Sequence, residues 1–389
     1  MTKSESTAKS SIQLIGLGVG LLGLTLTVFG WAVNTTQAAF SYHTAFMFWL
    51  SIALGALFLT ILHHLVGAVW SVVLRRVFET MASMLPLMVL FFLPVLFGRS
   101  HLFEWLHPEA VAADALLQQK TAYLNLPFFL IRAALFLGAW SLLSRWFYQK
   151  SLENDGSGDD ALIGRLRRLS PLAVILFALT LTFAAFDWLM SLDAHWFSTI
   201  FGVYYFSGCV VGALSVLTLL TLYFDKPGFL KGLVSVEHYH DLGKLLFTFT
   251  VFWAYIAFSQ YFLIWYANIP EETVWFSHRW IGSWKTITLL LVIGHFVIPF
   301  FLLIVRALKR NRLLLQVMSI WLLLMHWLDI FWLVMPNLHH HEAHVSWLDV
   351  TATVGIGGVL IAVFYGRLSK HSLIPVNDPK LNESIKHWL

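Results

Sequence analysis

Residues 238–272, HYHDLGKLLFTFTVFWAYIAFSQYFLIWYANIPEE, decide the fold class. The stretch begins with charged, hydrogen-bonding side chains and continues as an apolar run. The run is long enough to cross a bilayer, because a hydrocarbon core of about 30 Å takes roughly 20 helical residues. Trp265 suits the headgroup region at the far end, and Pro270 suits a helix stop. Polar residues inside the run, such as Thr250 and Gln260, need partners in a neighbouring helix or in water. The stretch therefore predicts a membrane-spanning helix packed inside a bundle.

The composition extends this interpretation to the whole chain. Of its 389 residues, 58% are hydrophobic and only 12% are charged, whereas soluble domains carry about 25% charged residues. An all-α, polytopic membrane protein follows. The net charge of +4 is too small to favour nucleic-acid binding. The single cysteine, Cys209, excludes a disulfide framework, iron–sulfur clusters and c-type haem attachment. Any redox partner is then another subunit, a diffusible molecule or a haem held by histidine alone.

Hydropathy predicts ten spans within one transmembrane domain, residues 11–368. They are placed at about 11–33, 42–74, 78–98, 125–148, 171–192, 197–223, 238–272, 280–306, 312–335 and 347–368. The second span is overlong, and Pro86 and Pro94 are expected to kink the third. Spans two to five (42–192) and six to nine (197–335) form two predicted four-helix bundles, with one flanking helix at each end. We expect a short surface helix within 99–124, a flexible connection at 150–170 and polar tails at 1–10 and 369–389, the latter docked or frayed.

The basic residues predict the orientation. With the N-terminus in the cytoplasm, 20 of the 25 Lys and Arg residues fall on the inner side and 5 on the outer side, a strong positive-inside signal. Both termini are then cytoplasmic.

Ionisable groups at membrane depth are the most informative side chains, because a charge there costs several kcal/mol unless it is paired or hydrated. On the inner side, a hydrated funnel is predicted from His63, His64, Glu79, Asp241 and Lys244, with ordinary helix-end charges and a helix-packing histidine as the alternative. On the outer side, Arg132 and Asp187 are predicted to pair, and so are Lys285 and Asp329. With His326 and His295, the second pair outlines a polar seam from the outer face to mid-membrane. The seam favours a proton half-channel, since imidazole and carboxyl groups relay protons; structural ion pairs are the alternative.

Two further groups of side chains lie on the outer side. The outer end of the fifth span carries a patch with the apolar and hydrogen-bonding groups that a quinone head needs: Asp187, Trp188, Met190, Ser191, Asp193, His195 and Trp196. Interfacial Trp residues and a helix cap are the alternative account. Residues 339–344, HHHEAH, match no metal-binding motif, so we expect a partner contact or a proton exit lined by His344 and Asp349 rather than a metal site. The depths of the histidines within the spans do not give the stacked pairs that haem b needs.

Four long stretches resemble one family of membrane subunits. They are SYHTAFMFWLSIALGALFLTILHHLVGAVWSVVLRRVFE at 41–79, TFAAFDWLMSLDAHWFSTIFGVYYFSG at 182–208, HDLGKLLFTFTVFWAYIAFSQYFLIWYANIPEET at 240–273 and LLLMHWLDIFWLVMP at 322–336. With the ten spans, the chain resembles the NrfD/polysulfide-reductase superfamily, and most closely the F-subunit branch of alternative complex III, a bacterial quinol:cytochrome c oxidoreductase.

The resemblance implies a cofactor-free subunit of the bacterial inner membrane, of a family described as quinone-binding. Its expected partners are a sister NrfD-like membrane subunit, a periplasmic iron–sulfur subunit and haem c subunits. It also implies a proton-path role for His63, His64, Glu79, Asp187, Asp193, Asp241, Lys244, His326 and Asp329. A secondary transporter or channel, and a purely structural scaffold, stay open as alternatives. Pro86 and Pro94 have no counterparts in the second bundle, which weighs against a transporter with broken helices in matched halves.

Overall fold

The computed structural model describes residues 3–227 and 229–387, and its regular elements are all helical. Ten helical spans in this part of the chain are long and apolar enough to cross a membrane, as predicted. They are α1 (Lys3–Val33), α2 (Thr35–Val66), α3 (Val72–Ala82) with α4 (Leu85–Phe97), α8 (Leu126–Ser157), α9 (Asp160–Trp188), α10 (Phe201–Phe224), α11 (Val236–Ala267), α13 (Trp284–Leu291) with the π-helix η3 (Val292–Val297) and α14 (Ile298–Leu303), α16 (Arg312–Val334) and α17 (Trp347–Leu368).

Short helices connect the spans or close their ends. They are α5 (Arg99–Leu102), η1 (Glu104–Leu106), α6 (Pro108–Ala113), α7 (Ala115–Lys120), η2 (Met190–Leu192), α12 (Pro270–His278), α15 (Arg306–Lys309), η4 (Met335–Asn337) and α18 (Leu381–Ile385).

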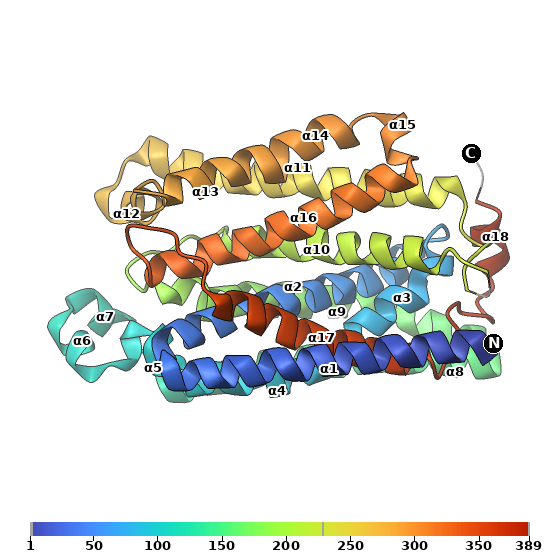
Figure 1. Ribbon diagram of the computed structural model, residues 1–389, viewed down its shortest axis with the longest axis horizontal. Coiled ribbons are helices and arrows are strands. Elements are labelled where there is room, and N and C mark those ends of the chain that lie inside the picture. Colours follow the sequence, from blue (N-terminus) through green and yellow to red (C-terminus); the bar gives the residue numbers. More distant parts are fainter. Residues whose placement is uncertain (1–2, 228, 388–389) are drawn as a thin grey trace.

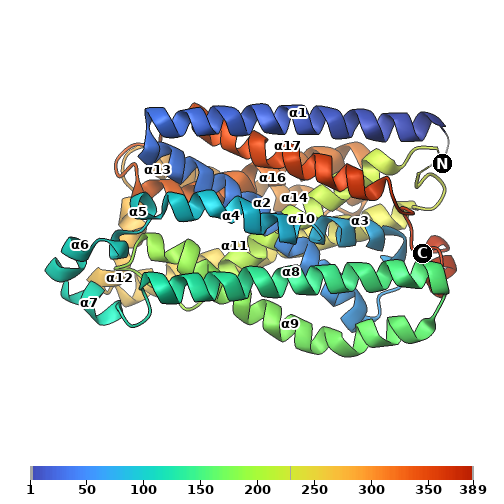
Figure 2. The ribbon, with the colours of Figure 1, turned by 90° about the horizontal axis from the view of Figure 1, so that it is seen from below.

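Helix α2 is the centre of the molecule. In its most apolar stretch, 83% of the residues are buried. It contacts α1, α3, α4, α9, α10, α16 and α17. Helices α2, α3–α4, α8 and α9 contact one another as the first four-helix bundle, and α10, α11, α13–α14 and α16 form the second. Helices α1 and α17 pack along each other at the side (Figures 1 and 2). The predicted arrangement of two bundles and two flanking helices matches these contacts.

The second span ends earlier than predicted. Instead of running to residue 74, α2 ends at Val66, where Gly67 adopts a left-handed conformation (φ 60°) and its N–H bonds to the His63 carbonyl. Glycine takes this conformation without steric cost, so it is a common helix terminator. The chain then turns and re-enters the bundle as α3. The third span is interrupted between Ala82 and Leu85, just before Pro86, as its proline content predicts.

Three connections can be compared with their predictions. The segment 99–124 forms α5, η1, α6 and α7 rather than one short helix. The connection 150–170, predicted to be flexible, is helical: α8 continues to Ser157 and α9 begins at Asp160. The C-terminal tail docks: the Ser384 hydroxyl accepts from the N–H of Val73 and donates to the carbonyl of Trp70. Residues 1–2 and 388–389 of the predicted tails lie outside the described residues.

Both ends of the chain lie at the same end of the helical bundle, which we call the terminal end; α6, α7 and α12 lie at the opposite, distal end (Figure 1). This agrees with an even number of crossings. Which end faces the cytoplasm stays a prediction from the basic residues.

Candidate functional site

The first buried polar group is centred on the carboxyl group of Asp329 on α16. Its side chain accepts from the hydroxyl of Tyr204 on α10 and from Nε1 of Trp253 on α11, 3.1 Å away. It is almost completely buried, at 2% exposure. The prediction that Lys285 pairs with Asp329 is wrong. Lys285 is exposed, with its ammonium over the Trp280 ring. The Asp329 carboxyl group is therefore held by two neutral donors.

Two histidines lie beside Asp329. His326, one helical turn earlier, bonds through Nε2 to the Ser51 hydroxyl of α2 at 2.7 Å. Its ring fits against Gly208, where a Cβ atom would come within 2.8 Å of it. His295, on the π-helix η3, stacks on Trp253 with 3.9 Å between ring centroids. Within the described residues, neither ring nitrogen of His295 has a hydrogen-bond partner. Asp329, His326, His295, Tyr204 and Trp253, which we call the core cluster, thus form one buried polar group.

A second buried group, the terminal cluster, is centred on Glu79 of α3. The Glu79 carboxylate lies 3.3 Å from Nε of Arg75 and 3.6 Å from both Nη1 of Arg76 and Nε2 of His64. The hydroxyl of Ser151 donates to it at 2.7 Å. Two arginines and a histidine around one carboxylate make a network of charges inside the bundle rather than an ordinary helix-end charge.

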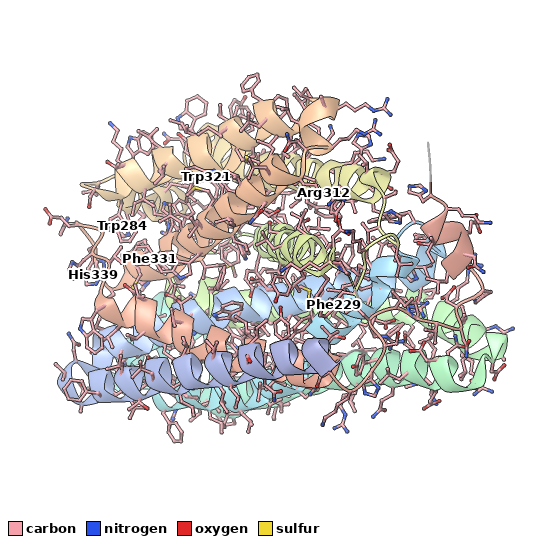
Figure 3. All side chains as sticks on the ribbon, turned by 45° about the vertical axis from the view of Figure 1, so that its right-hand side comes forward. Phe229, Trp284, Arg312, Trp321, Phe331 and His339 are labelled. Atoms are coloured by element: carbon pink, nitrogen blue, oxygen red, sulfur yellow. The ribbon has the colours of Figure 1, made fainter. Side chains whose placement is uncertain are left out.

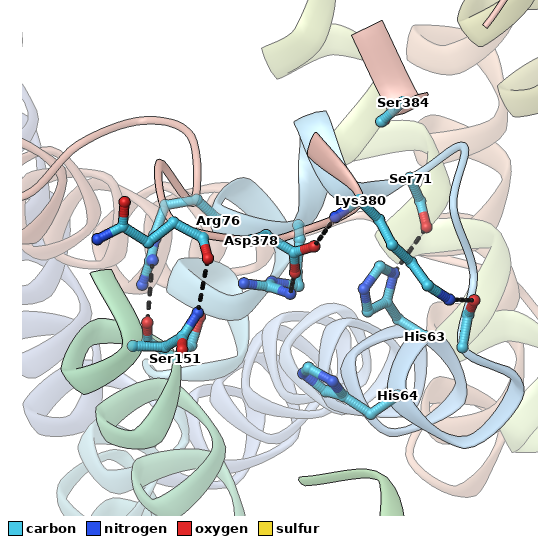
Figure 4. Close-up of polar contacts among 12 residues, drawn as sticks. His63, His64, Ser71, Arg76, Ser151, Asp378, Lys380 and Ser384 are labelled. Atoms are coloured by element: carbon cyan, nitrogen blue, oxygen red, sulfur yellow. Dashed lines mark hydrogen bonds and ion pairs between the residues drawn. The ribbon is translucent and has the colours of Figure 1, made fainter. Parts of the chain in front are cut away.

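The C-terminal tail covers the terminal cluster. Asp378 pairs with Arg75, and the ammonium of Lys380 donates to the Gly67 carbonyl at 2.8 Å (Figure 4). His63, next to His64, bonds through Nδ1 to the Ser71 hydroxyl at 2.8 Å. His64 and Glu79 of the predicted inner funnel therefore belong to one ion-pair network, and residues 378–384 of the tail pack over it.

Asp241 and Lys244, the other members of the predicted funnel, form a separate group. They pair with each other, and Nε2 of His387 in the tail lies 2.9 Å from the Asp241 carboxylate. Among the described residues they have no direct contact with Glu79. The C-terminal tail contacts both groups, through Asp378 at the terminal cluster and through His387 at Asp241.

The predicted pair of Arg132 and Asp187 is confirmed. Nε and Nη2 of Arg132 donate to the two carboxylate oxygens of Asp187 at 2.6 and 3.1 Å. The guanidinium also donates to the carbonyl of Tyr123 and lies over its ring, 3.8 Å from the centroid. Both side chains are buried, so the pair fastens α8 to α9 at the distal end.

The residues of the predicted quinone patch have different surroundings, although Met190, Ser191 and Trp196 line one cavity. Trp188 is fully buried, packed between the rings of Phe92 and Trp140. His195 is exposed and bonds to Asp114, whose pKa this hydrogen bond holds below its usual value. Asp193 is half-buried in the connection after η2. Trp196 stacks on Trp275 at 4.4 Å and also borders a cavity of about 370 Å³.

The histidine-rich loop 339–344 packs onto the distal end of the bundle (Figure 3). Nε1 of Trp284 donates to the His339 carbonyl at 2.6 Å, and Nε2 of His339 lies 2.8 Å from the side-chain oxygen of Gln37. Partial burial lowers the pKa of His339. Asp349 caps the first turn of α17 through the N–H of Ser346. No three His, Cys, Asp or Glu side chains in the described part of the chain are placed to hold a metal ion.

Sequence reasoning missed the partners of Asp329. Tyr204 lies inside the motif at 182–208 and Trp253 inside the opening stretch, but both read as apolar packing residues. The available signal was that a buried Tyr or Trp usually needs a partner for its O–H or N–H group.

Comparison with known proteins adds no assignment: neither a scan against protein-family models nor a search of curated proteins found a match to this chain.

Proposed function

We propose that this chain is an integral membrane subunit of a quinol:cytochrome c oxidoreductase complex of the NrfD-like class, and that it moves protons rather than electrons. It would lie in the bacterial inner membrane with both termini cytoplasmic. Electrons would pass through iron–sulfur and haem c groups of partner subunits, beside a sister NrfD-like subunit. The motif resemblance supports the complex, and the core cluster supports the role in proton movement.

The observation that carries the proposal is the environment of Asp329. An ionised carboxylate buried at membrane depth is costly unless a cation balances it. Here the described partners are a hydroxyl and an indole N–H, both neutral. A carboxyl group in such a place is better suited to hold a proton and release it than to form a structural ion pair. His326 and His295 are imidazoles within the same cluster, and imidazole is the side chain best suited to pass a proton near neutral pH.

The terminal cluster supplies a second set of ionisable groups at the other end. Among the described residues, no chain of hydrogen bonds joins Glu79 to Asp329. Two separated polar groups, one toward each side, are what a pair of half-channels requires, because a continuous polar path would leak protons. This arrangement favours proton transfer over a scaffold, in which a buried carboxyl without a cation has no use.

The substitution Asp329→Asn tests the proposal in the purified, assembled complex reconstituted into liposomes. Quinol oxidation by cytochrome c is followed together with the pH of the lumen. We expect electron transfer to continue while the protons moved per electron fall, since Asn keeps the size of the side chain and its amide oxygen can still accept from Trp253, but it cannot carry a proton. The control Asp114→Asn removes a half-buried distal carboxylate that lies outside both clusters and should leave this ratio unchanged.

Two outcomes would count against the proposal. An unchanged proton-to-electron ratio in the Asp329→Asn complex would leave only a scaffold. Isolation of the chain without cytochrome subunits, together with solute movement in liposomes that needs no quinol, would favour a transporter or channel.

A further inference from the structure

A crevice of about 830 Å³ opens on the side of the second bundle, between α11 and the α13–η3 helix. Helix α11 contacts η3 and α14 near mid-membrane, and the two helices separate toward the distal end. The rim is exposed and apolar, with Phe258 and Leu289 as examples, whereas the floor residues Trp253 and Gln260 are buried. The volume lies within the range of small-molecule sites, about 300–1,000 Å³.

The distal end of the crevice carries a buried positive charge. Arg279, 2% exposed, lies between the rings of Trp275 and Trp332 and donates to the carbonyl groups of Trp275, Trp332 and Leu333. In the described part of the chain, no carboxylate lies within salt-bridge distance of it. Burial lowers the pKa of Arg279 to about 9, so the guanidinium is still charged at neutral pH. The carbonyl groups satisfy its hydrogen bonds, and the nearby Asp193 carboxylate, which raises the pKa of Arg279, forms no ion pair with it in the described residues.

The dimensions of the crevice suit an amphiphile standing upright in the membrane. On α11 the lining runs from Val251 to Asn268, which is about 25 Å at 1.5 Å per residue and so reaches well into a hydrocarbon core of about 30 Å. Arg279 lies at the end where Trp265 and Trp280 are exposed. Exposed Trp residues mark the headgroup level. The charge is therefore at the depth of a lipid head, and the apolar slot is at the depth of its tails.

We propose that this crevice binds one anionic phospholipid, with its phosphate facing Arg279 and an acyl chain lying along α11 toward mid-membrane. Charge complementarity selects the head, since basic pockets between membrane helices bind anionic lipid heads. The apolar lining selects the tail. The inference does not depend on the proposed role in electron transfer.

The site has a consequence for the core cluster. Tyr204 and Trp253 line the floor of the crevice, and both donate to Asp329 on their far side. A bound acyl chain would fill the space next to these two side chains. It would then keep water from the lipid side away from the Asp329 carboxyl group.

The test is to purify the full-length chain, with whatever subunits accompany it, in mild detergent and to quantify bound lipid by mass spectrometry. We expect about one phospholipid retained per chain. The variant Ala257→Trp fills the crevice from a half-buried lining position and should reduce retention at least tenfold. The control Leu263→Trp adds the same ring at an exposed position of α11 that does not line the crevice, and should retain the lipid.

Head-group preference is measured on delipidated protein by titration with phosphatidylglycerol and phosphatidylcholine. One favourable charge predicts about fivefold tighter binding of phosphatidylglycerol, and Arg279→Gln should abolish the difference. If Arg279→Gln fails to fold, the preference of the wild type for phosphatidylglycerol and the lipid retention of Ala257→Trp still test the proposal. The proposal is overturned if no lipid is retained, if both Trp variants lose it equally, if the two lipids bind alike, or if the retained molecule is a quinone.

Discussion

The Arg132–Asp187 pair offers the sharpest test of how this molecule is held together. Replacing Asp187 with Asn keeps the shape of the side chain but leaves the buried guanidinium of Arg132 without its counter-ion. Breaking a buried pair in this way costs about 3–5 kcal/mol. Arg132 keeps its hydrogen bond to the Tyr123 carbonyl and its place over that ring, so we expect the low end, about 3 kcal/mol. That corresponds to roughly a 100-fold change in the unfolding equilibrium.

The chain contains a matched control at the same distance. Lys150 and Glu153 also approach to 2.6 Å, but the Glu153 side chain is 51% exposed whereas that of Asp187 is fully buried. Exposed pairs on a helix contribute about 0.3–0.5 kcal/mol, so Glu153→Gln should change stability by less than about 0.5 kcal/mol. The two substitutions differ mainly in burial.

Unfolding by a denaturing detergent in mixed micelles, followed through the fluorescence of the 18 tryptophans, measures both variants. The double variant Arg132→Met with Asp187→Leu should recover to within about 1 kcal/mol of the wild type, because well-packed apolar residues often replace a buried ion pair without loss. The reasoning is refuted if Asp187→Asn costs no more than Glu153→Gln. It is also refuted if the double variant is no more stable than Asp187→Asn.

Three other predictions use similar measurements. Glu79→Gln leaves two buried arginines short of a counter-charge and should cost about 3–5 kcal/mol in the same unfolding assay; a loss below 1 kcal/mol would mean that water already screens the cluster. Deleting residues 372–389 uncovers the terminal cluster, so a cysteine introduced by Ser71→Cys should react faster with a soluble maleimide than in the full chain; equal rates would show that the tail does not cover it. Gly23→Leu should destabilise the protein by about 1–3 kcal/mol through overpacking, because a Cβ atom there lies 2.7 Å from the Gly355 backbone, whereas Gly18→Leu faces open space and should be nearly neutral.

The span count and the two-bundle arrangement could be predicted from the sequence, because a 20-residue apolar run has few alternatives in a membrane. The position where α2 ends was missed. Residues 67–74, GAVWSVVL, continue the apolar pattern, and hydropathy does not register the conformation of Gly67. The flexible connection predicted at 150–170 was wrong for a related reason: polar composition marks where a helix leaves the lipid and not where its hydrogen bonding stops.

The two predicted ion pairs on the outer side had different outcomes for a geometric reason. Arg132 and Asp187 lie on helices that follow one another in the chain and pack side by side, so similar depth was enough to bring them together. Lys285 and Asp329 are also at similar depth, but depth says nothing about which way a helix is rotated. Asp329 faces α10 and α11, and the first half of the eighth span turns Lys285 outward. The contacts of Asp329 join three helices, α10, α11 and α16, and the spacing of residues along one helix does not predict which residues of the other two lie beside it.

The close fit of α1 against α17 has a consequence for how the protein is made. Gly20 and Gly23 approach the backbone of Val359 and Gly355 so tightly that a side chain at either glycine would collide with it, and α17 is the main neighbour of α1. During synthesis, α1 therefore lies in the bilayer without its main packing partner until α17 has left the ribosome. A nascent chain arrested before Trp347 would leave α1 without its main packing partner, and crosslinking between α1 and α17 would report the moment at which the two helices come together.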